Sequence, residues 1–221
     1  IIQQKIITHG ASNAIGFVKR NPYNNRIYIS ADATYGISGD KSELGYGSTD
    51  AWLIELDESL SIVREKVFGG SKMELEFSTI HFDEAYIYVA CSSHSGESGN
   101  KTSPSYTTTD VMSFFDAWLI KLDYDWSIIW DKTFGGNRDD YSSRLVRISN
   151  DRLGLSTSYN SMPNTGNVTM VNFGGLTYDM GLLILNNDGD LYYQNSYGGT
   201  DEDHGILTIG NNNTIILSSS S

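Results

Sequence analysis

The chain has 221 residues and a formal net charge of −12, with 27 acidic residues against 15 Lys and Arg. Because a phosphate-binding surface needs clustered Lys and Arg, this balance argues against nucleic acid or an anionic membrane surface as a partner. The single cysteine, Cys91, excludes an intrachain disulfide and a cysteine-rich metal site. Abundant Gly (22) and Tyr (14) favour turn-rich β structure over a helical bundle.

The start of the chain carries no targeting segment of charged and then apolar residues. Apolar runs such as 51–54 are too short to cross a bilayer, so we expect no direct membrane insertion. The first residue is Ile1 and not Met. We therefore expect a processed chain or a window of a longer polypeptide.

An internal repeat organises the sequence. One mark is D-A-W-L-I-E-L-D from Asp50, D-A-W-L-I-K-L-D from Asp116 and the degenerate D-M-G-L-L-I-L-N from Asp179. A second mark follows each at constant distance, as F-G-G at 68–70, F-G-G at 134–136 and Y-G-G at 197–199, with Thr8-His9-Gly10 one period earlier. Two marks that move together indicate a repeated supersecondary unit.

Each unit is predicted to hold four short strands, which fall in the middle unit at 77–82, 85–91, 116–123 and 127–133. In the third of these, Trp118, Ile120 and Leu122 point to one face and Ala117 and Leu119 to the other. A sheet that is apolar on both faces must be covered on both, which radial stacking achieves. The sequence therefore predicts an all-β fold, a β-propeller of four-stranded blades.

The connections set the blade boundaries. Asp188-Gly189 is a hairpin signal between strands three and four. The longest connections join strands two and three at 34–49, 92–115 and 157–178, and we expect these Ser-, Thr-, Gly- and Asn-rich loops to form the interaction surface.

The expected blades are approximately 11–70, 71–136 and 137–199, with a partial blade at 200–221 that a strand at 3–8 would complete. This makes about 3.75 blades and fifteen strands. The propeller is then four-bladed or part of a larger one, and either the ring is open or the chain is incomplete. We expect an incomplete chain, because a sheet that ends midway leaves an unprotected edge.

The repeat resembles the propeller-like repeats of large secreted or surface-anchored proteins of Bacteroidota. The resemblance rests on the segments 50–57, 68–70, 116–123 and 134–136 and on Trp130. It implies export to the cell surface or beyond and an adhesive or scaffolding role, and no shared catalytic residues come with such repeats. The pattern varies between copies, since Arg64 and Tyr193 stand in the place of Trp130 and Met180-Gly181 replace Ala117-Trp118.

A looser similarity to quinoprotein propellers lies in Leu122-Asp123 and Trp130. The Thr-Gly pair of that turn is missing, so no quinone cofactor is expected.

Three recurring acids are the candidate ligand-binding residues. Glu74, Asp140 and Asp203 each lie four positions beyond the second Gly of the Gly-Gly mark. Carboxylates repeated around an axis could hold Ca²⁺ or bind a polyhydroxylated sugar. In the alternative structural interpretation, each accepts hydrogen bonds from backbone N–H groups in the turn that enters the next blade. Asp50, Asp116 and Asp179 are interpreted similarly, as anchors of the long loops.

No other motif predicts a site. His9, His81, His94 and His204 occupy unrelated places in the repeat, and 200–204 is interpreted as a solvated acidic loop. Neither a G-x-S-x-G elbow nor a phosphate-binding loop with its Lys is present. We therefore expect no catalytic residue and no cofactor other than possible Ca²⁺.

The leading hypothesis is a non-catalytic extracellular or cell-surface binding, adhesion or scaffolding module that contacts a protein or glycan through its loop-bearing face. Two alternatives stay open. One is a carbohydrate-active enzyme, a hydrolase or lyase, with an acidic site on the propeller face. The other is a structural component of a large assembly, such as a phage tail or secretion apparatus.

Overall fold

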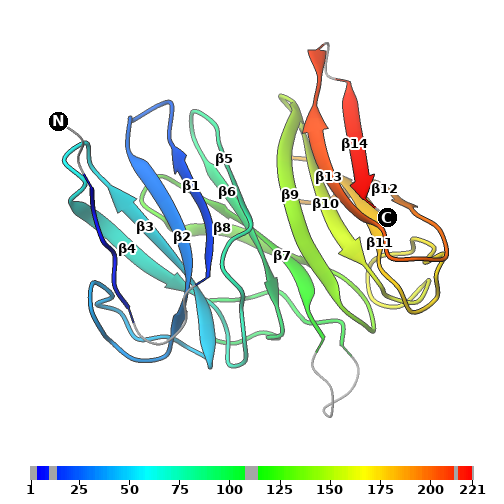
Figure 1. Ribbon diagram of the computed structural model, residues 1–221, viewed down its shortest axis with the longest axis horizontal. Helices are drawn as coiled ribbons and strands as arrows, with labels where there is room; N and C mark the ends of the chain where they lie inside the picture. Colours follow the sequence, from blue (N-terminus) through cyan, green and yellow to red (C-terminus); the bar gives the residue numbers. More distant parts are fainter. Residues whose placement is uncertain (1–3, 10–13, 108–113, 212–213, 221) are drawn as a thin grey trace.

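The computed structural model of the protein describes residues 4–9, 14–107, 114–211 and 214–220. This part of the chain forms fourteen β-strands and no α-helix (Figure 1). The described residues include no helix that is long and apolar enough to span a membrane.

The strands form three antiparallel four-stranded sheets and one hairpin, each a simple up-and-down meander. The first sheet is β1 (Ile15–Arg20), β2 (Ile27–Thr34), β3 (Thr49–Leu56) and β4 (Ile62–Phe68). The second is β5 (Thr79–Phe82), β6 (Ile87–Ser93), β7 (Asp116–Leu122) and β8 (Ile128–Phe134). The third is β9 (Asp140–Ser149), β10 (Arg152–Tyr159), β11 (Asp179–Leu185) and β12 (Leu191–Tyr197), and the hairpin is β13 (His204–Ile209) with β14 (Ile215–Ser220).

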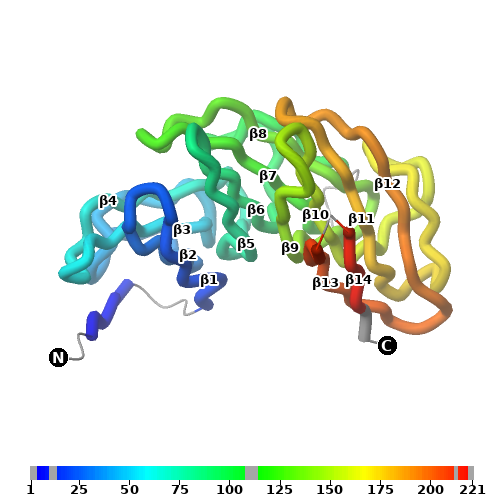
Figure 2. Tube along the Cα trace, turned by 90° about the horizontal axis from the view of Figure 1, so that it is seen from above, coloured from blue at the N-terminus to red at the C-terminus, as the bar shows by residue number. Residues whose placement is uncertain are grey.

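The sheets stand side by side along an arc. Figure 2 shows that the first strand of each unit, β1, β5, β9 and β13, lies on the concave side, whereas β4, β8 and β12 lie on the convex side. Residues 4–9 and the β13–β14 hairpin lie at opposite ends of this arc. The three long loops gather along one edge, the lower edge in Figure 1.

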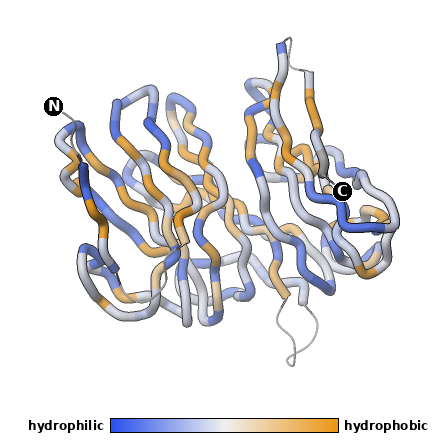
Figure 3. Tube along the Cα trace, viewed as in Figure 1, coloured by the Kyte–Doolittle hydropathy of each residue, from blue (hydrophilic) through white to orange (hydrophobic). Residues whose placement is uncertain are grey.

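The core is divided into layers between neighbouring sheets, and hydrophobic residues accordingly run along the strands (Figure 3). Leu53 and Phe68 of the first sheet pack with Trp118 and Ile120 of the second. Ala117 and Leu119, on the opposite face of β7, belong to the layer shared with the third sheet. The third sheet in turn packs on the β13–β14 hairpin through Met180, Leu182 and Leu207. Both faces of the second and third sheets are therefore covered by neighbouring units.

The predicted alternation of β7 and the strands of the middle unit are confirmed, with boundaries within two residues of those expected. The predicted strand at 3–8 is wrong for its described residues, because 4–9 form no strand and share no sheet with β13–β14. Residues 4–9 instead contact the first sheet, where Ile7 packs on its outward face and Thr8 bonds to Asp40. Residue 3 lies outside the described part.

Leu119→Ala tests the layered core. The side chain is fully buried between the second and third sheets, so its truncation should lower the free energy of unfolding by about 2–5 kcal/mol. Chemical denaturation measures the change. Ile129→Ala, on a half-exposed side chain of β8, serves as the control and should cost less than about 1 kcal/mol. Equal losses in the two variants would contradict the layered packing.

Candidate functional site

The three recurring acids lie where the chain passes from one sheet to the next. The backbone N–H of each acid donates to the backbone carbonyl of the residue that precedes the Asp of a third strand. The bonds run from Glu74 to Thr49 O (2.8 Å), from Asp140 to Phe115 O (2.6 Å) and from Asp203 to Tyr178 O (2.7 Å). Their carboxylates accept from the second Gly of each Gly-Gly mark, Gly70 (2.7 Å), Gly136 (2.8 Å) and Gly199 (2.7 Å). Each acid thus closes the connecting turn in the way the structural interpretation describes.

Two of these carboxylates are enclosed by the protein. Glu74 is fully buried and accepts a second bond from Ser93 Oγ at 2.7 Å. Asp140 is 1 % exposed and also accepts from the backbone N–H of Asn160 and from the N–H and Oγ of Ser161. Asp203 is half-buried. Over the described residues, no group of three or more His, Cys, Asp or Glu is suited to hold a metal ion, and a role for these acids in binding Ca²⁺ or sugar stays a prediction.

A second set of buried acids holds the ends of the long loops. Asp50 accepts from Tyr46 N–H at 2.8 Å, Asp116 from Tyr106 N–H at 2.9 Å and Ser105 Oγ at 3.0 Å, and Asp179 from Phe173 N–H at 2.6 Å. The remaining oxygens, Asp116 Oδ1 and Asp179 Oδ1, are buried and have no hydrogen-bond partner among the described residues. These carboxyls anchor loops, as the sequence interpretation proposed.

The first Gly of each Gly-Gly mark is explained by these acids. A Cβ atom would lie 2.0 Å from Asp50 Oδ1 at Gly69, 1.9 Å from Asp116 Oδ1 at Gly135 and 2.0 Å from Asp179 Oδ1 at Gly198. No side chain fits at that distance, so the strand end and the buried carboxyl can approach only at glycine.

The electrostatics of the junctions follow from burial. Desolvation raises the pKa of Asp50 and Asp116 to about 6, and that of Asp140 to about 7, where the neighbouring Asp116 carboxyl adds to the rise. Burial thus shifts each of these carboxyls toward its protonated form.

The long loops carry a repeated clasp that the sequence analysis missed. The turns 38–41, 98–101 and 165–168 share Ser or Thr, a Gly with positive φ, and Asp or Asn. Asn100 reaches the end of the preceding β4, accepting from Gly69 N–H at 2.9 Å and donating to Val67 O at 2.8 Å. Asn167 does the same to Gly135 and Thr133 at the end of β8. The recurring Ser-Gly-Asp-Lys and Ser-Gly-Asn-Lys letters were the signal available in the sequence.

Asp40 repeats this clasp at the edge of the first sheet. It accepts from Thr8 N–H at 2.8 Å, and its own N–H donates to Thr8 O at 2.7 Å. Thr8 therefore takes the position that Gly69 and Gly135 take at the other junctions.

The residue after each turn fastens the loop to the fourth strand of its own sheet. Ser42 bonds to Glu65, Thr102 to Asp131 and Thr169 to Gln194. Glu65 also accepts a hydrogen bond from the indole N–H of Trp52, and Asp131 accepts one from that of Trp118. In the third sheet, where the amide of Gln194 takes the place of the carboxylate, Gly181 stands in the position of the Trp. Each loop is thus held at two points.

The clasped loops present apolar side chains to solvent. We call the described residues 35–48, 94–107 and 160–178 the loop edge. Nineteen large hydrophobic side chains of the described chain are exposed, and eight of them lie on the loop edge: Tyr35, Ile37, Leu44, Tyr46, Met162, Val171, Phe173 and Leu176.

The other candidates do not converge. His94 stacks on Phe115, His9 packs on the edge of Trp52, and His204 lies 3.8 Å from the exposed Glu202. The 186–190 segment is the β11–β12 hairpin turn, with the Asn186 side chain accepting from the N–H groups of Asp188 and Asp190. The histidines therefore give no common site.

Comparison with known proteins gives little further information. No protein-family model and no curated protein matches the sequence. Among solved structures, a crystal structure of an ACO/RPE65 chimera is similar over 88% of this chain and 45% of its own, with 12% identity and a TM-score of 0.39. The chain spans less than half the length of that structure, and a similarity at this level carries no argument about activity.

Gly135→Ala tests the glycine requirement. The added methyl group would overlap the Asp116 carboxyl, so the variant should lose about 1–3 kcal/mol of unfolding free energy. Gly36→Ala is the control, because a Cβ there meets nothing within 4 Å. Thermal or denaturant unfolding of the two variants should separate them clearly, and a neutral Gly135→Ala would disprove the proposed close approach.

The buried carboxyls predict how stability depends on pH. Since folding raises the pKa of Asp116 from 3.8 to about 6, the folded state keeps a proton that the unfolded chain releases. This contribution is complete below about pH 4 and is lost as the pH rises through 6.

Asp116→Asn should therefore make the fall in unfolding free energy between pH 4 and 7 shallower, by about 2–3 kcal/mol. Asp201→Asn, at an exposed acid, is the control for the loss of one acidic side chain. Denaturant titrations at several pH values give the slopes. An unchanged slope in Asp116→Asn would refute the assignment.

Proposed function

We propose that the chain is part of a β-propeller of four-stranded blades and acts as a non-catalytic binding module, outside the cell or on its surface. In this proposal it contacts a protein or glycan partner through the loop edge. The observation that carries the proposal is the set of eight exposed apolar side chains on loops whose bases are fixed.

The fixed loop bases support a binding role because a pre-ordered surface loses less conformational entropy when a partner binds. Lys101 contributes to this order: its ammonium is buried and donates to Ser103 O at 2.7 Å and Thr133 Oγ1 at 2.6 Å. Lys41 holds Gly36 O at 3.0 Å in the first loop. Loops positioned by a rigid sheet scaffold are common sites of recognition.

Both ends of the arc support a propeller. At one end, Asp40 binds Thr8 in the same way as Asn100 binds the end of β4 and Asn167 the end of β8. At the other end, β13 and β14 pair in the same way as the first two strands of each sheet. Because these segments lie at opposite ends of the arc, we favour a larger ring over the four-bladed alternative (Figure 2).

The buried acids support the non-catalytic part of the proposal. The carboxylate oxygens of Glu74 and Asp140 accept hydrogen bonds from backbone N–H groups and hydroxyls of the turns, which leaves them little hydrogen-bonding capacity for a substrate. An export route and an adhesive or scaffolding setting remain part of the proposal, on the basis of the resemblance of the repeat.

The test is a glycan array together with a panel of purified extracellular proteins, probed with the wild-type chain and with the double variant Leu44→Ser/Phe173→Ser. Loss of two exposed apolar contacts should weaken any binding at least about tenfold. Val63→Ser/Ile129→Ser is the matched control, because both side chains are about half exposed on the convex strands β4 and β8.

If the control variant weakened binding as much as the loop variant, the loop edge would not be the binding surface. An absence of binding on both panels would count against a binding module. Turnover of a polysaccharide that Asp140→Asn abolishes would favour the carbohydrate-active enzyme instead.

A further inference from the structure

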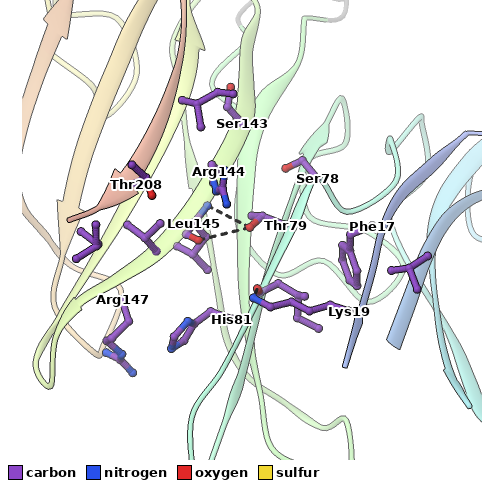
Figure 4. Close-up of a pocket in the computed structure, with 15 residues that line it drawn as sticks. Phe17, Lys19, Ser78, Thr79, His81, Ser143, Arg144, Leu145, Arg147 and Thr208 are labelled. Atoms are coloured by element: carbon purple, nitrogen blue, oxygen red, sulfur yellow. Dashed lines mark hydrogen bonds between the residues drawn. The ribbon is translucent and has the colours of Figure 1, made fainter. Parts of the chain in front are cut away.

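The concave side of the arc holds an open cavity of about 630 Å³, which we call the inner groove. It lies between the first strands of all four units, β1, β5, β9 and β13. Figure 4 shows the lining side chains, with Lys19 reaching across from β1 and His81 and Arg147 below it. The volume lies in the range of small-ligand sites.

The charge of the inner groove is opposite to that of the protein. Its lining includes Lys19, Arg144, Arg147 and His81, and no Asp or Glu. The chain as a whole carries −12, so a cavity with three cations and no lining acid is a marked local exception. Such a concave cationic surface concentrates anions.

Two of the cations lack a carboxylate. Lys19 Nζ donates to Ile80 O at 3.0 Å and makes no ion pair, and the exposed Arg144 guanidinium has neither a hydrogen-bond nor an ion-pair partner within the described chain. Arg147 is already compensated, since it pairs with Asp83 at 2.8 Å and bonds to Asn187. The uncompensated charge of the inner groove therefore lies on Lys19 of β1 and Arg144 of β9, which line the same cavity.

The two charges repel each other. Burial and the nearby Arg144 charge lower the pKa of Lys19. Burial, with Arg147 and Lys19 as further causes, lowers the pKa of His81 to about 4, so this imidazole is neutral at neutral pH and offers one donor and one acceptor. An anion between Lys19 and Arg144 would remove the repulsion.

The rest of the lining suits a hydroxylated ligand. The hydroxyls of Ser143 and Thr208 have no hydrogen-bond partner within the described residues and are free to bond outward. Phe17 and Val18 add apolar surface, which the C–H face of a sugar ring can cover. The positive charge, the free hydroxyls and the apolar surface of Phe17 and Val18 together match an acidic sugar better than they match a polyanion without hydroxyls or an apolar face.

We propose that the inner groove binds an acidic sugar residue, with Lys19 and Arg144 holding its carboxylate and Ser143 and Thr208 bonding its hydroxyls. This site is separate from the loop edge and does not depend on it. A short oligogalacturonate is the probe.

The experiment is isothermal titration of the full chain with trigalacturonate, with the neutral trisaccharide galactotriose and with a hexaglutamate peptide. We expect binding of the galacturonate alone, weakened by added salt because the contact is ionic. Lys19→Gln and Arg144→Gln should each raise its Kd about tenfold, as for loss of a charge-assisted hydrogen bond. Arg144→Lys should retain part of the affinity.

Arg20→Gln is the matched control. Arg20 is an exposed cation of the same strand as Lys19, pairs with Glu58 and does not line the groove, so its loss should leave the Kd unchanged. Thermal unfolding of each variant verifies folding. Three results would each overturn the proposal. The first is an affinity for galactotriose equal to that for trigalacturonate, the second is an equal effect of Arg20→Gln and Arg144→Gln on the Kd, and the third is tighter binding of hexaglutamate than of trigalacturonate.

Discussion

Apolar side chains on both faces of each third strand impose the constraint on which the rest of this structure depends. Neither face of a sheet built around β7 can be left in water, because Trp118 and Ile120 lie on one face and Ala117 and Leu119 on the other, all fully buried. The neighbouring sheets supply the cover, and repetition of the same unit turns the stack into an arc. The concave inner groove and the loop edge are consequences of that arrangement.

Polar groups at the junctions then fix the spacing between sheets. Asp116 approaches Gly135 where no Cβ fits, Asp140 ties the turn to Gly136, and Asn167 clasps the same strand end from the following loop. These contacts give the recurring acids a structural role at the junctions. Arg144, whose guanidinium keeps free hydrogen-bonding capacity within the described chain, is not part of the repeat.

The period-two pattern made the sheets predictable, because alternation at Trp118 to Leu122 is read directly from adjacent letters. The strand expected at 3–8 did not form over its described residues 4–8, since a strand needs a hydrogen-bonded neighbouring strand and sequence could not show that Thr8 would bond to the turn residue Asp40 instead. The asparagine clasp depends on contacts between one loop and the preceding sheet, which composition alone does not reveal. The inner groove was equally hidden, because Lys19 and Arg144 line one cavity only after three sheets have stacked.

Native-state hydrogen exchange of an Ile120→Ala variant tests the central claim most directly. Ile120 belongs to β7 and is buried in the layer shared with the first sheet. If each sheet is stabilised by its neighbour, the truncation lowers the protection of backbone amides in β3 of the first sheet as well as in β7. Loss of protection confined to the second sheet, with β3 unchanged, would contradict the account.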